Sequence, residues 1–118
     1  MKFLLMMHMS PAVWESLTED QRNEVFEGHG DFMKLASESG EMVETKAIAE
    51  AGVTKTVRVR EGKVEATTGP LVESETFLCG YYLVDVADEE RAIELAALIP
   101  DAKHTAIEVR PVLYEAKA

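Results

Sequence analysis

The fold of this chain is decided by one continuous stretch, Gly69-Pro70-Leu71-Val72-Glu73-Ser74-Glu75-Thr76-Phe77-Leu78-Cys79-Gly80-Tyr81-Tyr82-Leu83-Val84-Asp85-Val86. Its first eight residues have the glycine, proline and polar side chains of a turn. In residues 77–86, the even-numbered and odd-numbered positions are both largely apolar. Successive side chains of a strand point to opposite faces, so this pattern predicts a strand covered by protein on both sides.

Residues 2–8 have the same property. Phe3, Leu5 and Met7 would face one way, and Leu4 and Met6 the other. Two strands that are apolar on both faces require cover above and below the sheet that contains them.

Two helices provide part of that cover. Ser10-Pro11 predicts the start of a helical segment, and Thr18 with Gln21 forms a capping box. We expect the main helix to run from about Thr18 to Ser39 and to end at Gly40. Its apolar stripe contains a histidine and consists of Val25, Phe26, His29, Phe32, Met33 and Ala36. A second helix, capped by Asp88 and ended by Pro100-Asp101, has the core face Ala92, Leu95, Ala96 and Ile99.

The remaining strands complete an α+β pattern. We expect a strand at Met42–Ala49, a hairpin around the turn Glu61-Gly62, and a last strand at Thr105–Tyr114. Pro111 places that last strand at a sheet edge. The order is ferredoxin-like βαββαβ with an extra β-hairpin, in one domain over residues 1–118. Two helices cover one face of four strands, so we expect a homodimer to cover the other.

Composition excludes several functions. The net charge of −10 argues against nucleic acid and against an anionic membrane surface as partners. No apolar run is long enough to span a membrane, and the first residues lack a signal-peptide cleavage site, so we expect a cytoplasmic protein. Cys79 is the only cysteine, and His8, His29 and His104 lie far apart, so we expect no metal site. Nothing has the form of a phosphate loop, and we expect no cofactor.

Three segments carry a resemblance to a known family. Thr68-Gly69-Pro70-Leu71-Val72-Glu73-Ser74-Glu75 is followed by Cys79-Gly80-Tyr81-Tyr82, and the chain closes with Ile107-Glu108-Val109-Arg110-Pro111-Val112. Together they resemble the DGPF-motif branch of the YCII-related family. Thr68, Leu71 and Glu75 depart from that motif, where the branch has aspartate, phenylalanine and lysine.

The resemblance implies a dimeric α/β-barrel built from two ferredoxin-like subunits. Some relatives look like small enzymes that use a His-Asp pair, one of them a dehydrochlorinase acting on a chlorinated hydroxyquinol. His29 sits where those relatives carry their histidine. Their aspartate near the end of the first strand has no equivalent in Met7-His8-Met9. Members of the branch are often encoded beside sigma factors, which points to regulation.

His29 is the candidate acid/base residue, because the ordinary pKa of a histidine side chain lies near neutral pH and suits proton transfer there. The alternative is a core histidine bonded to a backbone carbonyl or a tyrosine hydroxyl. Asp85 and Glu73 are candidate partners for the imidazole, although either could serve only as a local cap. The candidate ligand-binding residues are Glu73, Ser74, Tyr81, Tyr82 and Arg110.

Two functions follow. The first is a small-molecule-binding protein or enzyme that uses His29 for acid/base chemistry. The second is a non-catalytic dimeric accessory protein linked to transcriptional regulation. The sequence leaves open whether the protein is an enzyme.

Overall fold

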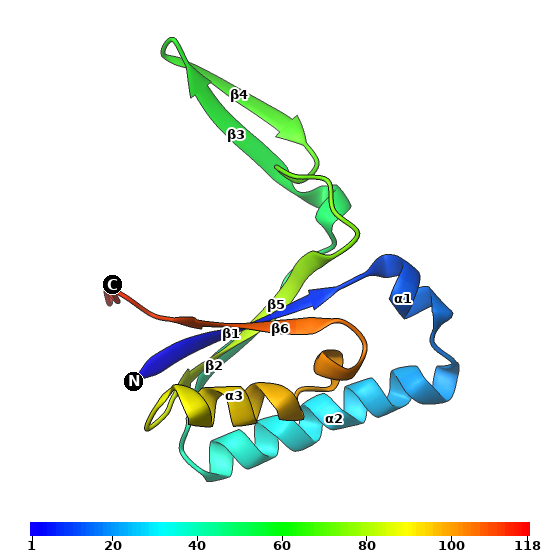
Figure 1. Cartoon of the computed structure of the whole chain (residues 1–118). Coiled ribbons are helices and arrows are strands. Elements are labelled where there is room, and N and C mark those ends of the chain that lie inside the picture. Colours follow the sequence, from blue (N-terminus) through cyan, green and yellow to red (C-terminus); the bar gives the residue numbers. More distant parts are fainter.

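A four-stranded antiparallel sheet forms the centre of the computed structural model, which describes residues 1–118 (Figure 1). Its strands are β1 (Lys2–Met9), β2 (Met42–Ala47), β5 (Phe77–Asp85) and β6 (Ala106–Pro111), in the order β2-β5-β1-β6. The two strands predicted to be apolar on both faces are therefore the two central ones. The strand that contains Pro111 lies at an edge, as predicted.

Helices α2 (Glu19–Glu38) and α3 (Glu89–Leu98) cover one face of this sheet (Figure 1). The shorter α1 (Pro11–Ser16) precedes them, and two 3-10 turns, η1 (Ala51–Val53) and η2 (Pro100–Lys103), complete the helical segments. The predicted caps are confirmed. The Ser10 side chain caps α1, Thr18 and Gln21 form a capping box on α2, and Asp88 caps α3.

The core lies between the sheet and the two long helices. All four residues predicted for the face of α3 are buried. On α2 the prediction holds for Val25, Phe32 and Ala36 and is wrong for Phe26, whose side chain is 63% exposed. Phe26 packs edge to face against Trp14 of α1 and lies outside the core.

The opposite face of the sheet has no cover within the chain. Since Phe3, Leu5, Tyr82 and Val84 are buried under the helices, the alternate residues of β1 and β5 point away from them. We call this side of the sheet the open face. Its central residues are only partly buried and comprise Leu4, Met6, Tyr81 and Leu83.

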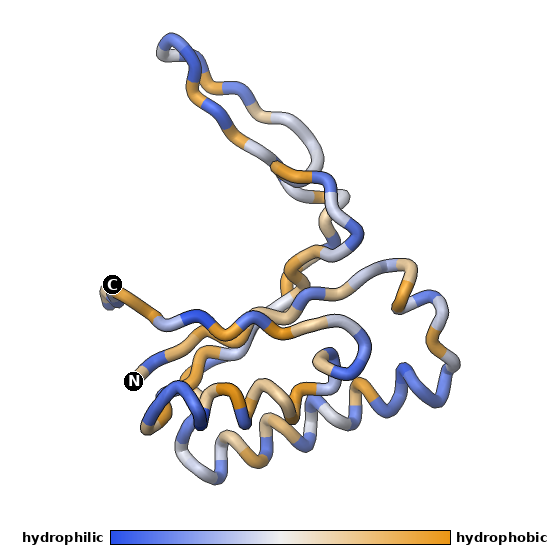
Figure 2. Tube along the Cα trace, in the orientation of Figure 1, coloured by the Kyte–Doolittle hydropathy of each residue, from blue (hydrophilic) through white to orange (hydrophobic).

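The predicted hairpin is a separate two-stranded sheet of β3 (Lys55–Arg60) and β4 (Lys63–Thr68). It projects from the body on the side away from the helices (Figure 1). Glu61 and Gly62 both have positive φ, 52° and 75°, as the tight hairpin turn requires. Hydrophilic and hydrophobic residues alternate along it (Figure 2), and both of its faces are exposed.

The order in which the four antiparallel strands and the two covering helices follow one another along the chain is compatible with a ferredoxin-like fold. None of the helices combines the length and the apolar character that crossing a membrane would need.

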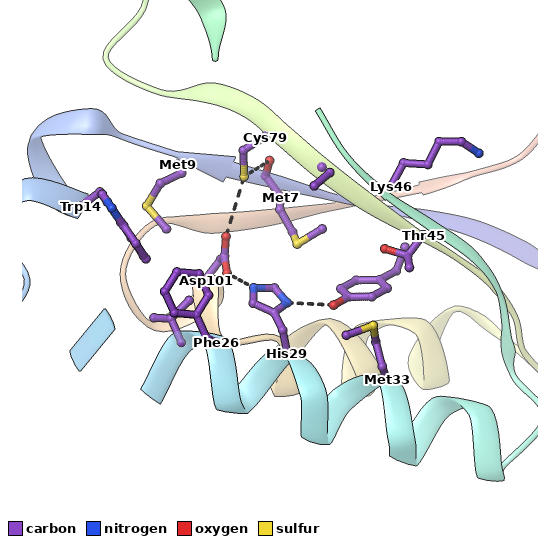
Figure 3. Close-up of a pocket in the computed structure, with 14 residues that line it drawn as sticks. Met7, Met9, Trp14, Phe26, His29, Met33, Thr45, Lys46, Cys79 and Asp101 are labelled. Atoms are coloured by element: carbon purple, nitrogen blue, oxygen red, sulfur yellow. Dashed lines mark hydrogen bonds and ion pairs between the residues drawn. The ribbon is translucent and has the colours of Figure 1, made fainter. Parts of the chain in front are cut away.

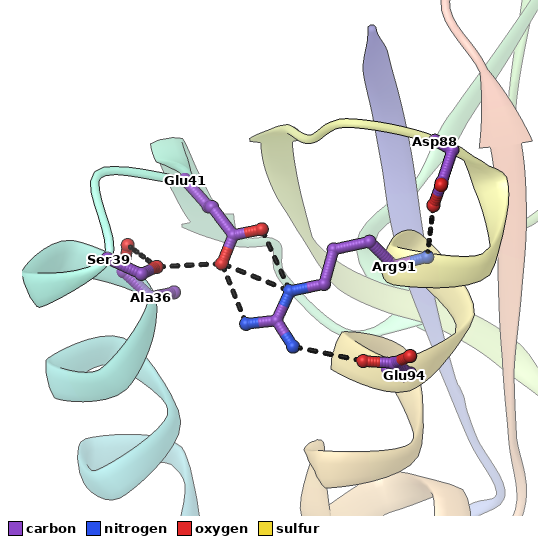
Figure 4. A network of polar contacts seen from close by, with 6 residues as sticks. All are labelled: Ala36, Ser39, Glu41, Asp88, Arg91 and Glu94. Atoms are coloured by element: carbon purple, nitrogen blue, oxygen red, sulfur yellow. Dashed lines mark hydrogen bonds and ion pairs between the residues drawn. The ribbon is translucent and has the colours of Figure 1, made fainter.

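An ion-pair network joins the end of α2 to α3 (Figure 4). The Arg91 guanidinium donates to the Glu41 carboxylate from Nε at 2.9 Å and from Nη2 at 2.8 Å. The Ser39 hydroxyl donates to the same carboxylate at 2.8 Å. These hydrogen bonds, those from Arg91 first, hold the pKa of Glu41 below its ordinary value.

We therefore expect Glu41→Gln to lower the urea midpoint of unfolding at pH 7. A lowered folded-state pKa stabilises the fold above the ordinary carboxyl value of 4.5 and loses that effect as the pH falls through the folded value. The difference between wild type and Glu41→Gln should thus shrink below pH 4.5. Glu94→Gln, at a more exposed carboxylate, is the control. A difference that is the same at pH 7 and pH 3 would contradict this account.

Candidate functional site

His29 extends from the middle of α2 toward the sheet and lies between two polar groups from distant segments (Figure 3). Its Nδ1 is 2.8 Å from the hydroxyl of Tyr82 on β5. Its Nε2 is 2.7 Å from Oδ1 of Asp101 on η2. The two rings of His29 and Tyr82 also stack, with centroids 5.9 Å apart.

The directions of these hydrogen bonds follow from the groups involved. The Asp101 residue is 3% exposed, and an ionised carboxylate can only accept hydrogen bonds. The imidazole therefore donates from Nε2 to Asp101. In the neutral ring Nδ1 then carries the lone pair, and it accepts the hydrogen bond from the Tyr82 hydroxyl. Asp101 thus fixes both the tautomer and the orientation of His29.

The turn that carries Asp101 is held in place by its own backbone. The Asp101 carbonyl accepts hydrogen bonds from the amides of His104 at 3.1 Å and Thr105 at 2.9 Å. Ile99, just before the turn, is fully buried in the core. Asp101 therefore has little freedom to move away from the imidazole.

A glycine beside the histidine lets this turn approach α2. A Cβ atom added to Gly28 would lie 2.4 Å from Cγ of Pro100, far inside van der Waals contact. The proline ring cannot move aside as a flexible side chain could. The close approach of α2 and η2, and with it the His29–Asp101 bond, therefore depends on the missing side chain at position 28.

Asp101 also affects two neighbouring groups. Sγ of Cys79 lies 3.9 Å from Oδ2 of Asp101 and 3.4 Å from the carbonyl oxygen of Met7. Burial, with a smaller effect of the Asp101 charge, raises the pKa of Cys79 to about 11. The same two causes raise the pKa of Tyr82 to about 12. Near neutral pH the thiol and the phenol are both protonated, so Tyr82 is a hydrogen-bond donor.

These groups line a cavity of about 530 Å³ between α2 and the sheet, which we call the histidine pocket. This volume falls in the range of small-molecule sites. Tyr82 and Asp101 lie at His29, Thr45 and Lys46 come from β2, and most of the wall is apolar (Figure 3). The apolar side chains on that wall include Met7, Met9, Trp14, Val25, Phe26 and Met33.

The structure brings together two of the candidate residues, His29 and Tyr82, in this pocket. Tyr81 lies on the open face, where its hydroxyl donates to Glu44 at 2.8 Å. Asp85 and Arg110 also point to that face. The Asp85 carboxylate accepts from the amino group of Met1 at 2.9 Å, and the Arg110 guanidinium lies 3.6 Å from Glu108.

Glu73 and Ser74 lie in the exposed loop between β4 and β5, and neither lines the histidine pocket. The Ser74 hydroxyl accepts a hydrogen bond from the amide of Thr76 at 3.3 Å, a local turn interaction. The structure therefore does not bring Glu73 or Asp85 to His29, and the carboxylate that contacts the imidazole is Asp101.

Sequence reasoning missed Asp101 as a site residue. An aspartate after a proline at the end of a helix has a sufficient local explanation as a terminator. Its contact with His29 spans 72 residues of chain, and no local pattern indicates it. Phe26 was missed as a pocket residue because an apolar stripe on a helix usually indicates core packing, and no pattern indicated Trp14.

Taken together, these features define an α+β domain in which a helix-borne histidine, bonded to a buried carboxylate, faces an apolar pocket. The model of the YCII-related domain matches residues 1–115, and the chain belongs to this family. No curated protein matched the chain. The family prediction is thereby confirmed, and the assignment to the DGPF branch stays a prediction.

Gly28 and Gly30 offer a matched test of how η2 is positioned. We expect Gly28→Ala to destabilise the protein by about 1–2 kcal/mol, because overpacking against Pro100 outweighs the better helix propensity of alanine. Gly30 has no atom near its added Cβ, so Gly30→Ala should stabilise the protein by about 0.5–1 kcal/mol. Urea unfolding measures both. Equal effects of the two substitutions would show that α2 and η2 do not make this contact.

The single cysteine allows a second test. Because burial and Asp101 raise the pKa of Cys79 to about 11, alkylation by iodoacetamide should be slow at pH 7 and should keep accelerating up to about pH 11. Asp101→Asn removes the charge and should make the reaction faster at a given pH. Mass spectrometry of the intact chain gives the rates. Rapid alkylation of the folded wild type at pH 7 would refute this placement of the thiol.

Proposed function

We propose that the histidine pocket binds a small, mostly apolar molecule and that His29 exchanges a proton with it. The observation that carries this proposal is the 2.7 Å contact between His29 and the buried Asp101 at the polar end of an otherwise apolar cavity. Asp101 has no other side-chain partner except the more distant thiol of Cys79.

The wall of the pocket favours a ring-shaped ligand. Three methionines and three phenyl or indole rings line it, and such groups adapt to flat apolar molecules. His29, Tyr82 and Asp101 form the hydrogen-bonded polar cluster of the wall, which Thr45 and Lys46 also line. The ligand would therefore bring a hydroxyl or carbonyl group to the imidazole. This is the arrangement typical of small-molecule sites.

The proton chemistry follows from the orientation of the ring. Nδ1 is the basic nitrogen, and it accepts from Tyr82 in the free protein. A ligand hydroxyl that replaces this contact would give its proton to Nδ1, and the imidazolium that forms would be stabilised by the Asp101 carboxylate. Tyr82, which stays protonated, would donate to the ligand oxygen that becomes negative. Return of the proton restores the neutral ring.

We also propose that the protein is a homodimer whose subunits meet at their open faces. Partly buried apolar side chains on both central strands support this, because an apolar sheet face needs a covering layer. The open face and the histidine pocket lie on opposite sides of the sheet, so a dimer would leave the pocket accessible. A non-catalytic dimer with a regulatory role uses the same surface and remains the second candidate.

Calorimetric titration with small phenols and hydroxyquinones tests the pocket. We expect His29→Ala to weaken binding about tenfold or more, since it removes the polar group that orients the ligand. If a proton moves to Nδ1, the binding enthalpy of the wild type will depend on the ionisation enthalpy of the buffer. His29→Ala should lose this dependence, and Asp101→Asn should reduce it.

His104→Ala is the matched control, because His104 lies outside the histidine pocket. It should bind as the wild type does. If His29→Ala changes neither the binding affinity nor the dependence of the binding enthalpy on the buffer, the acid/base proposal is wrong.

A further inference from the structure

We propose that the β3–β4 hairpin is a docking arm that packs against a second copy of this chain. The arm consists of residues 55–68. This inference rests on the homodimer proposed above and adds to it the element that closes over the partner.

The arm carries an apolar stripe that nothing in the chain covers. Val57 pairs with Ala66 across the hairpin, and Val59 pairs with Val64, so these four side chains share one face. The three valines are 61%, 66% and 73% exposed in chain order. An isolated two-stranded hairpin is marginally stable in water, and it needs packing against another element to persist. The stripe therefore requires a partner surface.

The arm makes the chain more extended than its length requires. A compact domain of 118 residues has a radius of gyration of about 13–14 Å, whereas this chain has 16.3 Å. The arm rises on the side of the open face, opposite the helices (Figure 1). A second subunit packed on the open face would lie in the angle between the sheet and the arm. The shape of the chain thus places the arm against the partner.

Charge favours a second copy of this chain as the occupant. The arm has four basic and two acidic side chains, giving +2, while the other 104 residues carry −12. Arg58, Arg60 and Glu65 share the face opposite the stripe, where the guanidinium of Arg60 lies 3.8 Å from Glu65. A basic arm on an acidic body is complementary to another copy of that body and is attracted to it at long range.

The base of the arm is fixed by hydrogen bonds. The Gly69 amide donates to the Thr54 carbonyl at 2.7 Å, and the Thr56 hydroxyl donates to the Gly69 carbonyl at 2.8 Å. Gly69 has φ of +116°, a conformation that favours glycine. These hydrogen bonds therefore close the base of the arm and hold its two strands together.

Sedimentation velocity of the full chain over a concentration series tests the proposal. Val59→Asp combined with Val64→Asp places two charges in the stripe and should raise the dimer dissociation constant about tenfold or more. Ile93→Asp introduces one such charge at an exposed isoleucine of α3 and should leave the constant unchanged. Leu83→Lys changes the open face itself and should give a monomer.

Hydrogen exchange provides a second measurement. Arm amides should exchange quickly in dilute, monomeric protein and become protected as the dimer forms. Fast exchange of the arm in fully dimeric protein would overturn the proposal.

The outcomes separate the arm from the dimer. If the double aspartate variant dimerises like wild type while Leu83→Lys is monomeric, the proposed docking role of the arm is wrong and the open-face dimer stands. If wild type is monomeric at every concentration, the proposed docking role of the arm and the proposed homodimer are both wrong. Neither outcome affects the ligand proposal, which calorimetry tests separately.

Discussion

Two central strands with apolar side chains on both faces impose the main constraint on this structure. The helices α2 and α3 cover Phe3, Leu5, Tyr82 and Val84, which builds the core. The same covering layer brings His29 over the sheet and places it against Tyr82. The other face of the same strands is left without cover, and the surface proposed for dimerisation arises there. The candidate site and the proposed interface thus lie on the two sides of one sheet.

At the candidate site, the arrangement depends on the buried carboxylate of Asp101. A buried charge is unfavourable unless it is paired or hydrogen-bonded, and Asp101 has His29 as its closest side-chain partner. The pairing explains why the ring has one defined orientation. Burial, with a smaller effect of the Asp101 charge, raises the pKa values of the neighbouring thiol and phenol, which therefore keep their protons.

Local patterns predicted the elements well, because their signals are contained within a few residues. The capping box of Thr18, the tight turn at Glu61-Gly62 and the buried face of α3 all appear where the sequence indicated. The site was less predictable, because it depends on contacts between distant segments. The sequence alone indicated that Tyr81 and Tyr82 face opposite ways, and it did not indicate which of them faces the helices. Asp101 is joined to His29 only by the packing of η2 on α2 at Gly28. Strand alternation predicted the hairpin, but it did not indicate that the apolar face of the hairpin is left uncovered by the rest of the chain.

The pocket also contains the chain's single tryptophan. Trp14 lies on its wall, with its ring edge to face against Phe26 at 5.6 Å and the guanidinium of Arg22 at 5.6 Å from its centre. Indole emission is sensitive to water, to nearby charge and to stacked rings. Light absorbed by indole alone therefore excites one fluorophore at one location in this protein. The molecule carries its own spectroscopic reporter of whether that cavity is filled, and no label has to be attached to read it.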